Sequence, residues 1–459
     1  MNSAAPAPDG IAAASLTGFD QSLVRSCLLN VVEAINGVLV PELNGSARAR
    51  AGECVTILLR AVQALGAADA DAAQLARLLA EPGPVAPASW RATADAEGAI
   101  LDRAEAAADA AGQPAAGTAT GGRSFDPERF QTFLRQHQLG GAATRVTGSR
   151  QLAGGRSKQT IMVTLEGASG LPTTVVVRQD WSSAVTGTSV VAEYALLRRV
   201  FDAGLRVPQP LLLEKSPDAL GGPFLVVTPM PGGAQGDIFN PPRSERLALQ
   251  VAAQLAQLHQ LAPEEFSALG VPTEAYSQAQ LREGLQGFRA LNGKLGVPCR
   301  TIEIATDWLE RNIEGVKGGK AMLHNDLGCH NFLIEGEELT AILDWELAHI
   351  GNPAADLGYV RDWIGQMTPW PRFMQAYRAA GGPAVDQATL DFYTLWCGVR
   401  LYCLLLQARA GVAMGMVKDT EITYAVAQFM PKLLHRISRE LRAILNQSGE
   451  QARSTLKLQ

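Results

Sequence analysis

The sequence predicts an α+β protein with a strand-rich lobe, a helix-rich lobe after it, and a small all-α module before both. Three observations predict this order. Apolar residues repeat at helical spacing over residues 19–112. β-Branched runs separated by Gly and Pro follow between residues 148 and 233. Helical patterns then dominate from Pro242 to about Asn446. Such segregation of strands and helices favours two lobes with a cleft between them.

The N-terminal module is predicted from helical spacing. Phe19, Leu23, Cys27, Val31 and Ile35 recur every fourth residue, and further helical patterns follow up to an Ala-rich segment. We expect the module to pack against the main domain or a second subunit, as in a homodimer, and an independent binding role is the alternative. The predicted divisions are a disordered tail, the helical module, a flexible linker, the first lobe, the second lobe and a C-terminal tail: 1–18, 19–112, 113–125, 126–231, 232–446 and 447–459.

Composition and charge narrow the class of protein. The 459 residues are 47% hydrophobic and 19% charged, which is typical of a soluble globular protein, and the net charge of −5 does not favour nucleic acid as a partner. No segment approaches the ~20 apolar residues of a membrane helix, and the N-terminus does not resemble a secretory signal. We therefore expect a cytoplasmic protein with reduced thiols. Its six scattered cysteines form no C-x-x-C pair: Cys27, Cys54, Cys299, Cys329, Cys397 and Cys403.

The segment MLHNDLGCHNFLI and the run LTAILDW after it contain the residues that phosphoryl transfer needs. Asp326 precedes Asn331 by five residues, and Asp344 ends an apolar strand thirteen residues later. One carboxylate can accept a proton from an attacking hydroxyl, while an amide and a second carboxylate supply the oxygen ligands that Mg²⁺ prefers. Each aspartate alone would favour a polar turn or a helix cap. The three residues together in this spacing favour catalysis.

These motifs resemble the aminoglycoside phosphotransferase and choline kinase superfamily over roughly residues 126–446. The resemblance implies a bilobal protein-kinase-like fold that binds ATP and Mg²⁺ in the cleft between lobes. It implies Asp326 as catalytic base, with Asn331 and Asp344 as metal ligands. His324 would brace the catalytic loop, and Asp356 would hydrogen-bond the backbone of that loop.

The resemblance also implies a nucleotide site in the first lobe. Gly154, Gly155 and Ser157 of GGRSKQT would cover the phosphates in a glycine-rich hairpin. Further positions fall on the strand cation, its helix glutamate and the adenine hinge: Arg178, Glu193, Thr228 and Met230. The family usually has lysine at the strand position. Arginine also binds phosphate oxygens but in a different geometry, so an inactive or a specialised enzyme remains open.

The acceptor is predicted from the region after Asp356. The run ILDWELAHIGNPAADLGYV resembles kinase domains associated with acyl-CoA dehydrogenases, which implies a 4-hydroxyacyl-CoA substrate. The run WCGVRLYCLLLQARAG resembles the Arg-containing helix of the same branch, which implies a substrate-binding role for Arg400. Residues 361–442 carry ten Lys/Arg and six Asp/Glu, a balance that favours an anionic acceptor over a polycation. A solvated helix face remains the alternative for each arginine. Aminoglycoside or macrolide phosphorylation, and a pseudokinase scaffold, are the alternative functions.

Overall fold

The protein is described from a computed structural model that defines residues 85–457 with gaps, and short pieces between 28 and 79. The gaps are 111–124, 138, 153–157, 181–188, 275, 296–298 and 418–419. Contacts divide the chain into a helical unit and a main unit. The helical unit comprises 1–119, 295–301 and 404–446. The main unit comprises 120–294, 302–403 and 447–459, so it contains the predicted first lobe and the predicted second lobe apart from residues 295–301 and 404–446. The six divisions predicted from the sequence stay predictions.

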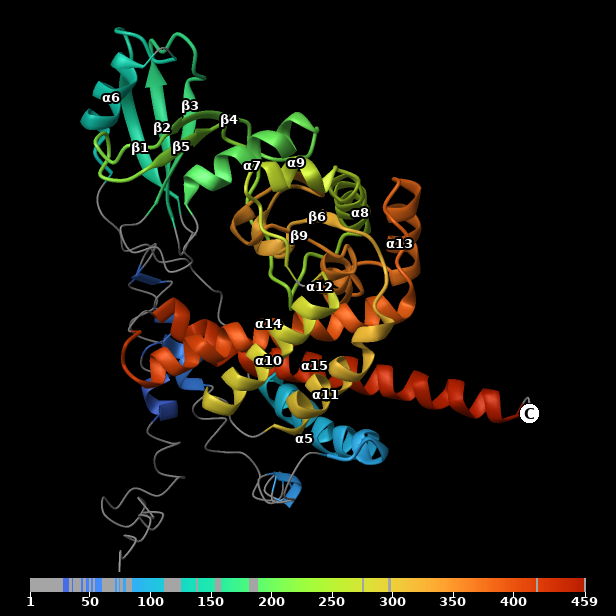
Figure 1. Cartoon of the computed structure of the whole chain (residues 1–459). Coiled ribbons are helices and arrows are strands. Elements are labelled where there is room, and N and C mark those ends of the chain that lie inside the picture. The colour runs from blue at the N-terminus through green and yellow to red at the C-terminus, as the bar shows by residue number, and fades with distance from the viewer. Residues whose placement is uncertain are drawn as a thin grey trace, which may run out of the picture. The chain divides into compact units, whose positions relative to one another are not determined.

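The first lobe of the main unit is built on an antiparallel sheet with strand order β1-β2-β3-β5-β4. The strands are β1 Arg145–Gln151, β2 Lys158–Glu166, β3 Thr174–Asp180, β4 Pro210–Glu214 and β5 Phe224–Val227. Helix α6 (Pro127–Gln136) lies against one face of this sheet (Figure 1). Asp126 caps α6 by accepting hydrogen bonds from two backbone N–H groups of its first turn. Sequence patterns predict the other strands, but β4 was not predicted.

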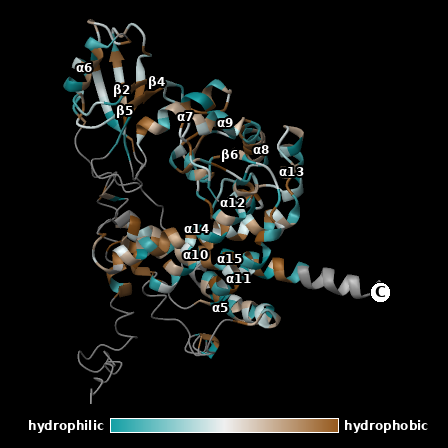
Figure 2. Ribbon diagram, in the orientation of Figure 1, coloured by the Kyte–Doolittle hydropathy of each residue, from teal (hydrophilic) through white to brown (hydrophobic). Residues whose placement is uncertain are grey.

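Side chains alternate along these strands, because one face of the sheet packs into a hydrophobic core while the other carries polar side chains. Brown, apolar residues recur along these strands in Figure 2. The core under α6 includes Phe130, Leu134, Ile161, Val163, Leu165, Val175, Val177, Leu212, Phe224 and Val226. Burial of each large side chain contributes roughly 1.5–3 kcal/mol. Thr160 pairs with Arg178 across β2 and β3, and Lys158 lies two residues before Thr160, so both cations are on the opposite face. Helix α7 (Val190–Asp202) contacts β3, β4 and β5.

The second lobe is mainly helical, with two short antiparallel sheets, β6-β9 and β7-β8. Its helices are α8 Glu245–His259, α9 Pro263–Ala268, α10 Gln278–Leu295, α11 Arg300–Asn312, α12 Ala354–Ile364, α13 Trp370–Ala379 and α14 Gln387–Ala413. Its strands are β6 Ala321–Leu323, β7 Phe332–Glu335, β8 Glu338–Ile342 and β9 His349–Gly351. Short 3₁₀ helices η4 Ile313–Gly315, η5 Cys329–Asn331 and η6 Trp345–Leu347 join them.

The helical unit confirms the prediction of an all-α module. Helix α5 (Trp90–Ala110) follows the 3₁₀ helix η3 (Pro87–Ser89), and α15 spans Thr420–Lys457. Glu97 of α5 is buried and accepts hydrogen bonds from the backbone N–H groups of Arg300 and Thr301. These bonds satisfy a carboxylate that would otherwise be buried without partners. The predicted tail 1–18 and linker residues 113–124 lie outside the described residues.

Two further expectations concern thiols and membranes. The described cysteines are free thiols: Cys54, Cys299, Cys329, Cys397 and Cys403. Among the helices that the structure describes, none combines the length and the apolar character needed to cross a bilayer.

Candidate active site

The loop between β6 and β7 contains Asp326, and a buried aspartate of α12 accepts hydrogen bonds from the backbone of this loop. Asp356 is fully buried and accepts hydrogen bonds from the backbone N–H groups of His324 (2.9 Å) and Asn325 (2.7 Å). Its second interaction is with His259, whose Nε2 lies 3.3 Å away. Burial would raise the pKa of Asp356, but these donors outweigh it and lower the pKa. The carboxylate therefore stays charged and holds the loop, including Asn325 in its left-handed conformation (φ 65°).

His324 connects this loop to the segment that ends in Asp344. Its Nε2 lies 2.9 Å from the carbonyl oxygen of Leu343, and its Nδ1 accepts a hydrogen bond from the backbone N–H of Asp326 (3.3 Å). The same ring packs against Trp345, with 4.6 Å between ring centroids. One buried imidazole therefore fixes the distance between the two acidic segments.

The carboxylate of Asp326 is oriented by three side chains. Tyr359 of α12 donates a hydrogen bond to Oδ1 (2.5 Å), and Asn331 Nδ2 donates to Oδ2 (2.9 Å). His330 Nε2 lies 3.5 Å from the same Oδ2. Burial would raise the pKa of Asp326, but His330 and Tyr359 outweigh it and lower the pKa to about 2. Asp326 is therefore an ionised and weakly basic group, suited to orienting a hydroxyl.

Asp344 lies next to Asn331 and has an unsatisfied oxygen. The backbone N–H of Leu343 donates to the carbonyl oxygen of Asn331 (2.8 Å), which ties the two segments together. Asp344 adopts a left-handed conformation (φ 61°) at the start of η6. Among the described residues its buried Oδ1 has no hydrogen-bond partner, and Arg178 Nη2 is 3.8 Å away. Burial raises the pKa of Asp344 despite Arg178. Such a carboxylate suits a bound cation.

The face of the sheet opposite α6 contributes two cations to this region. Arg178 of β3 forms an ion pair with Glu193 of α7. Lys158 of β2 donates a hydrogen bond to Glu346 Oε2 (2.9 Å) and lies 3.4 Å from Glu193 Oε2. Burial would lower the pKa of Lys158, but Glu193 and Glu346 outweigh it and raise the pKa. Lys158 and Glu346 are not among the site residues predicted from the sequence. The signal was cross-strand register, because Lys158 is a diagonal neighbour of Arg178 only once the strands are paired.

The remaining nucleotide positions are only partly described. Thr228 follows β5, and its N–H donates a hydrogen bond to the carbonyl oxygen of Gln209 (3.0 Å). Met230 lies two residues further on and is partly buried. Gly154, Gly155 and Ser157 lie outside the described residues. The structure therefore brings together the predicted catalytic and metal residues with Arg178 and Glu193, and it gives no view of the glycine hairpin.

Two neighbours of the catalytic residues have limited roles. Cys329 is buried, and burial raises the pKa of its thiol to about 12, so it is an unreactive packing residue. His330 contacts Asp326 as described above, and its side chain is 45% exposed. His330 is therefore partly open to solvent, beside the carboxylate of Asp326 whose pKa it lowers.

Arg400 lies at a cavity of about 370 Å³ in the second lobe that reaches the catalytic loop. Its Nη2 donates a hydrogen bond to the carbonyl oxygen of Asn325 (2.8 Å). The wall combines carboxylates with aromatic rings: Glu274, Glu283, Phe288 and Trp396. The cavity thus combines one arginine with two carboxylates, and it is lined by Asn325, the residue before Asp326.

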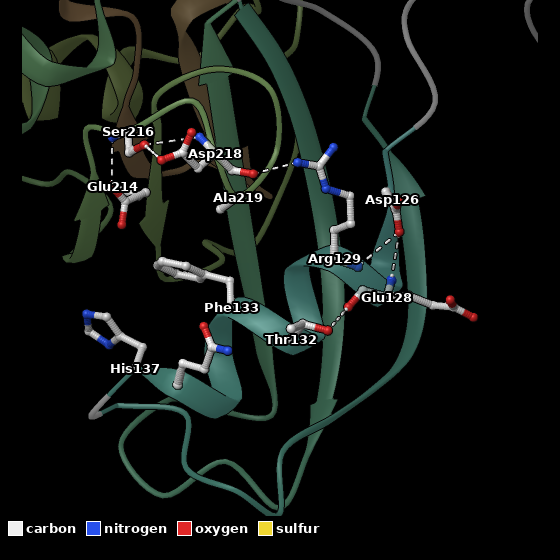
Figure 3. A pocket seen from close by; sticks show the side chains of 11 residues that line it. Asp126, Glu128, Arg129, Thr132, Phe133, His137, Glu214, Ser216, Asp218 and Ala219 are labelled. Carbon is white, nitrogen blue, oxygen red and sulfur yellow. Dashed lines mark hydrogen bonds between the residues drawn. The ribbon is translucent and has the colours of Figure 1, made fainter.

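A second hollow, of about 660 Å³, lies between α6 and the loop after β4 (Figure 3). Figure 3 shows its polar residues bonded to one another. Arg129 donates to the carbonyl oxygen of Asp218, and Ser216 donates to the carboxylate of Asp218. None of its lining residues is a predicted site residue.

Comparison with known families now identifies the class. The phosphotransferase enzyme family matches residues 148–393, more than half of the chain. The chain belongs to this family. Membership confirms the prediction of a phosphotransferase of the aminoglycoside phosphotransferase type.

Curated relatives of this phosphotransferase fall into two groups. Human acyl-CoA dehydrogenase family member 11 is 26% identical over 258 residues, which cover 54% of this chain and 32% of the human protein. Viomycin phosphotransferase of Streptomyces vinaceus is 26% identical over 179 residues, covering 36% of this chain and 58% of the relative. The chain thus spans about a third of the length of the acyl-CoA dehydrogenase relative. Similarity to that protein fits the predicted branch of the family.

A solved structure supports the fold. A Ralstonia eutropha protein provisionally named an aminoglycoside phosphotransferase superposes with a TM-score of 0.54 at 17% identity, covering 70% of this chain and 99% of the other. The bilobal kinase-like fold predicted from the sequence is therefore confirmed.

Proposed function

We propose that this phosphotransferase transfers the γ-phosphoryl group of ATP to a hydroxyl group of a small molecule, with Mg²⁺. One observation carries the proposal. Asn331 donates a hydrogen bond to Asp326 while its carbonyl oxygen accepts one from Leu343, the residue before Asp344. Hydrogen bonds therefore connect Asp326, Asn331 and the segment of Asp344, the three groups that phosphoryl transfer requires.

The chain's own residues suit a metal and a nucleotide. Asn331 and Asp344 would hold Mg²⁺, and the buried Oδ1 of Asp344, which has no hydrogen-bond partner among the described residues, is an oxygen ligand of the required kind. When bound, Mg²⁺ would neutralise charge on the phosphates. Arg178 would face the phosphates from β3, and the backbone near Thr228 and Met230 would contact adenine. Gly154, Gly155 and Ser157 are proposed to cover the phosphates.

Asp326 would orient the acceptor hydroxyl and accept its proton as the new phosphate ester bond forms and the bond to ADP breaks. Tyr359 and Asn331 hold the carboxylate in one orientation, which lowers the entropic part of the barrier. Since the pKa of Asp326 is lowered to about 2, positioning contributes more to the rate than basicity.

For the acceptor we propose a hydroxyacyl-CoA of the 4-hydroxy type. Two observations support an anionic thioester. The curated relatives include acyl-CoA dehydrogenase family members, and Arg400 lies at the cavity beside the catalytic loop. The aromatic residues Phe288 and Trp396 would contact apolar parts of the acceptor.

A cationic antibiotic is the second candidate acceptor. Glu274 and Glu283 in the same cavity would attract a polycation, and viomycin phosphotransferase is among the relatives. A catalytically inactive scaffold is the alternative from another class, since Arg178 replaces the usual lysine. A homodimer through the helical module and a cytoplasmic location stay predictions.

The test is a screen of ATP consumption with hydroxyacyl-CoAs, free hydroxy acids, choline and aminoglycosides in parallel. We expect the highest kcat/KM with a 4-hydroxyacyl-CoA, and a kcat about a thousandfold lower in an Asp326→Asn variant. A preference for an aminoglycoside would overturn the acceptor assignment but not the phosphoryl transfer. Binding of Mg·ATP without turnover on any acceptor would support the inactive scaffold.

A further inference from the structure

Lys158 is a buried cation that the family comparison does not assign to any role. Its side chain is 1% exposed, against 17% for Arg178. It contacts Glu346 Oε2 at 2.9 Å and Glu193 Oε2 at 3.4 Å. A lysine is almost never this buried unless its charge is paired, and here two carboxylates from different elements provide the pairing.

The two carboxylates connect Lys158 to both halves of the nucleotide site. Glu193 is also the ion-pair partner of Arg178, so one glutamate of α7 contacts cations on two strands. Glu346 belongs to η6 and lies two residues after Asp344. Lys158 thus joins β2, α7 and the segment of the proposed metal ligand.

Charge shows why a second cation is needed. Three carboxylates gather here, on Glu193, Asp344 and Glu346, and Lys158 and Arg178 face them. Without Lys158, Arg178 alone would face three carboxylates, and this excess of negative charge would repel phosphate groups.

We propose that Lys158 is a positioning residue for the nucleotide, an inference that rests on the proposed function. Lys158 holds Glu193 and Glu346, and through them it fixes Arg178 and the Asp344 segment. Arg178, the more exposed cation, is left to face the phosphates. Two cations on neighbouring strands therefore take two roles, where the family usually has a single strand lysine. Lys158 positions the carboxylates, and Arg178 contacts the phosphates.

Lys158 could instead serve only to neutralise Glu346 in the folded protein. Two variants separate these roles. Lys158→Met keeps the apolar length of the side chain and removes the charge. Lys158→Met combined with Glu346→Gln also removes the carboxylate that would be left unpaired. Arg145→Met is the control, because Arg145 forms an exposed ion pair with Glu166 on the same sheet.

The experiment measures the dissociation constant of a fluorescent ATP analogue with Mg²⁺, the melting temperature, and KM for Mg·ATP and for the acceptor. We expect Lys158→Met to weaken nucleotide binding and raise KM for Mg·ATP about tenfold, with acceptor KM unchanged. The double variant should recover melting temperature while nucleotide binding stays about tenfold weaker. Arg145→Met should match the wild type.

Two results would overturn the proposal. One is nucleotide binding within about twofold of the wild type in Lys158→Met. The other is full recovery of nucleotide binding in the double variant, which would reduce Lys158 to a neutraliser of Glu346. Failure of the proposed function can be told apart from failure of the Lys158 proposal. If the wild-type protein binds Mg·ATP but phosphorylates no acceptor, the proposed function fails, and nucleotide binding by the variants still tests the role of Lys158. Wild-type protein that binds no Mg·ATP overturns both.

Discussion

The catalytic loop and the charge cluster around Glu193 are held in different ways. In the loop, hydrogen bonds with short distances fix the backbone, as between Asp356 and Asn325 at 2.7 Å. In the cluster, Glu193 Oε2 and Asp344 Oδ1 lack hydrogen bonds among the described residues, and their cations lie at 3.4 and 3.8 Å. The loop is organised without a ligand. The cluster is the part of the site whose polar groups a bound cation and phosphates would satisfy.

The largest expected effect is at Asp326. Asp326→Asn should lower kcat about a thousandfold, because the acceptor hydroxyl loses its proton acceptor and its alignment. Affinity for Mg·ATP should stay near that of the wild type, since Asp326 itself is not among the proposed metal ligands or phosphate contacts. Steady-state kinetics and nucleotide binding measure this, with Asp218→Asn on the outer face of the first lobe as control. Undiminished phosphorylation would break the assignment of the loop.

Asp344→Asn tests whether the charge cluster around Glu193 binds the metal. We expect turnover to fall about a hundredfold or more and Mg·ATP to bind about tenfold more weakly, because a charged metal ligand is lost. Titration of Mg²⁺ at fixed ATP concentration measures the effect. Metal-dependent binding equal to the wild type would mean that Asp344 is not a ligand.

Asp356→Ala should mainly affect stability. Two backbone N–H groups and His259 lose a buried acceptor, which we expect to cost about 3 kcal/mol of unfolding free energy. Denaturant unfolding of the main unit measures this change. A variant as stable as the wild type would contradict the view that the loop is fixed by this carboxylate.

Tyr359→Phe tests whether the hydrogen bond from Tyr359 orients Asp326 in the catalytic loop. One hydrogen bond to a charged acceptor is removed, and we expect kcat to fall about tenfold with KM for ATP unchanged. An equal loss of affinity for ATP would indicate that Tyr359 supports the cluster as well.

Arg178→Lys should give the smallest change. Lysine keeps the charge but cannot reach Glu193 and Asp344 at once with a forked head group, so KM for Mg·ATP should rise about threefold. ATP-dependent kinetics measure the rise. A lower KM would mean that arginine at this position weakens nucleotide binding.

The local motifs were predictable because their function depends on short spacing along the chain. Asp326 and Asn331 are five residues apart in one loop, and Leu343 precedes Asp344 at the end of β8. Helical and strand patterns likewise predicted the two lobes and the helical module. Strand β4 was missed because its apolar residues lie beside Pro and Gly signals that indicate a loop.

The sequence alone determined the family, the order of lobes and the catalytic segment, because periodicity and short motifs are properties of the chain. Tertiary structure decided which charges meet. Lys158 and Glu346 are 188 residues apart and become partners only through strand register and packing of the lobes within the main unit. Tertiary structure also decided that Tyr359 orients Asp326, since a hydrogen bond across 33 residues leaves no local pattern. Long-range contacts of this kind depend on three-dimensional packing, which spacing along a single chain does not encode.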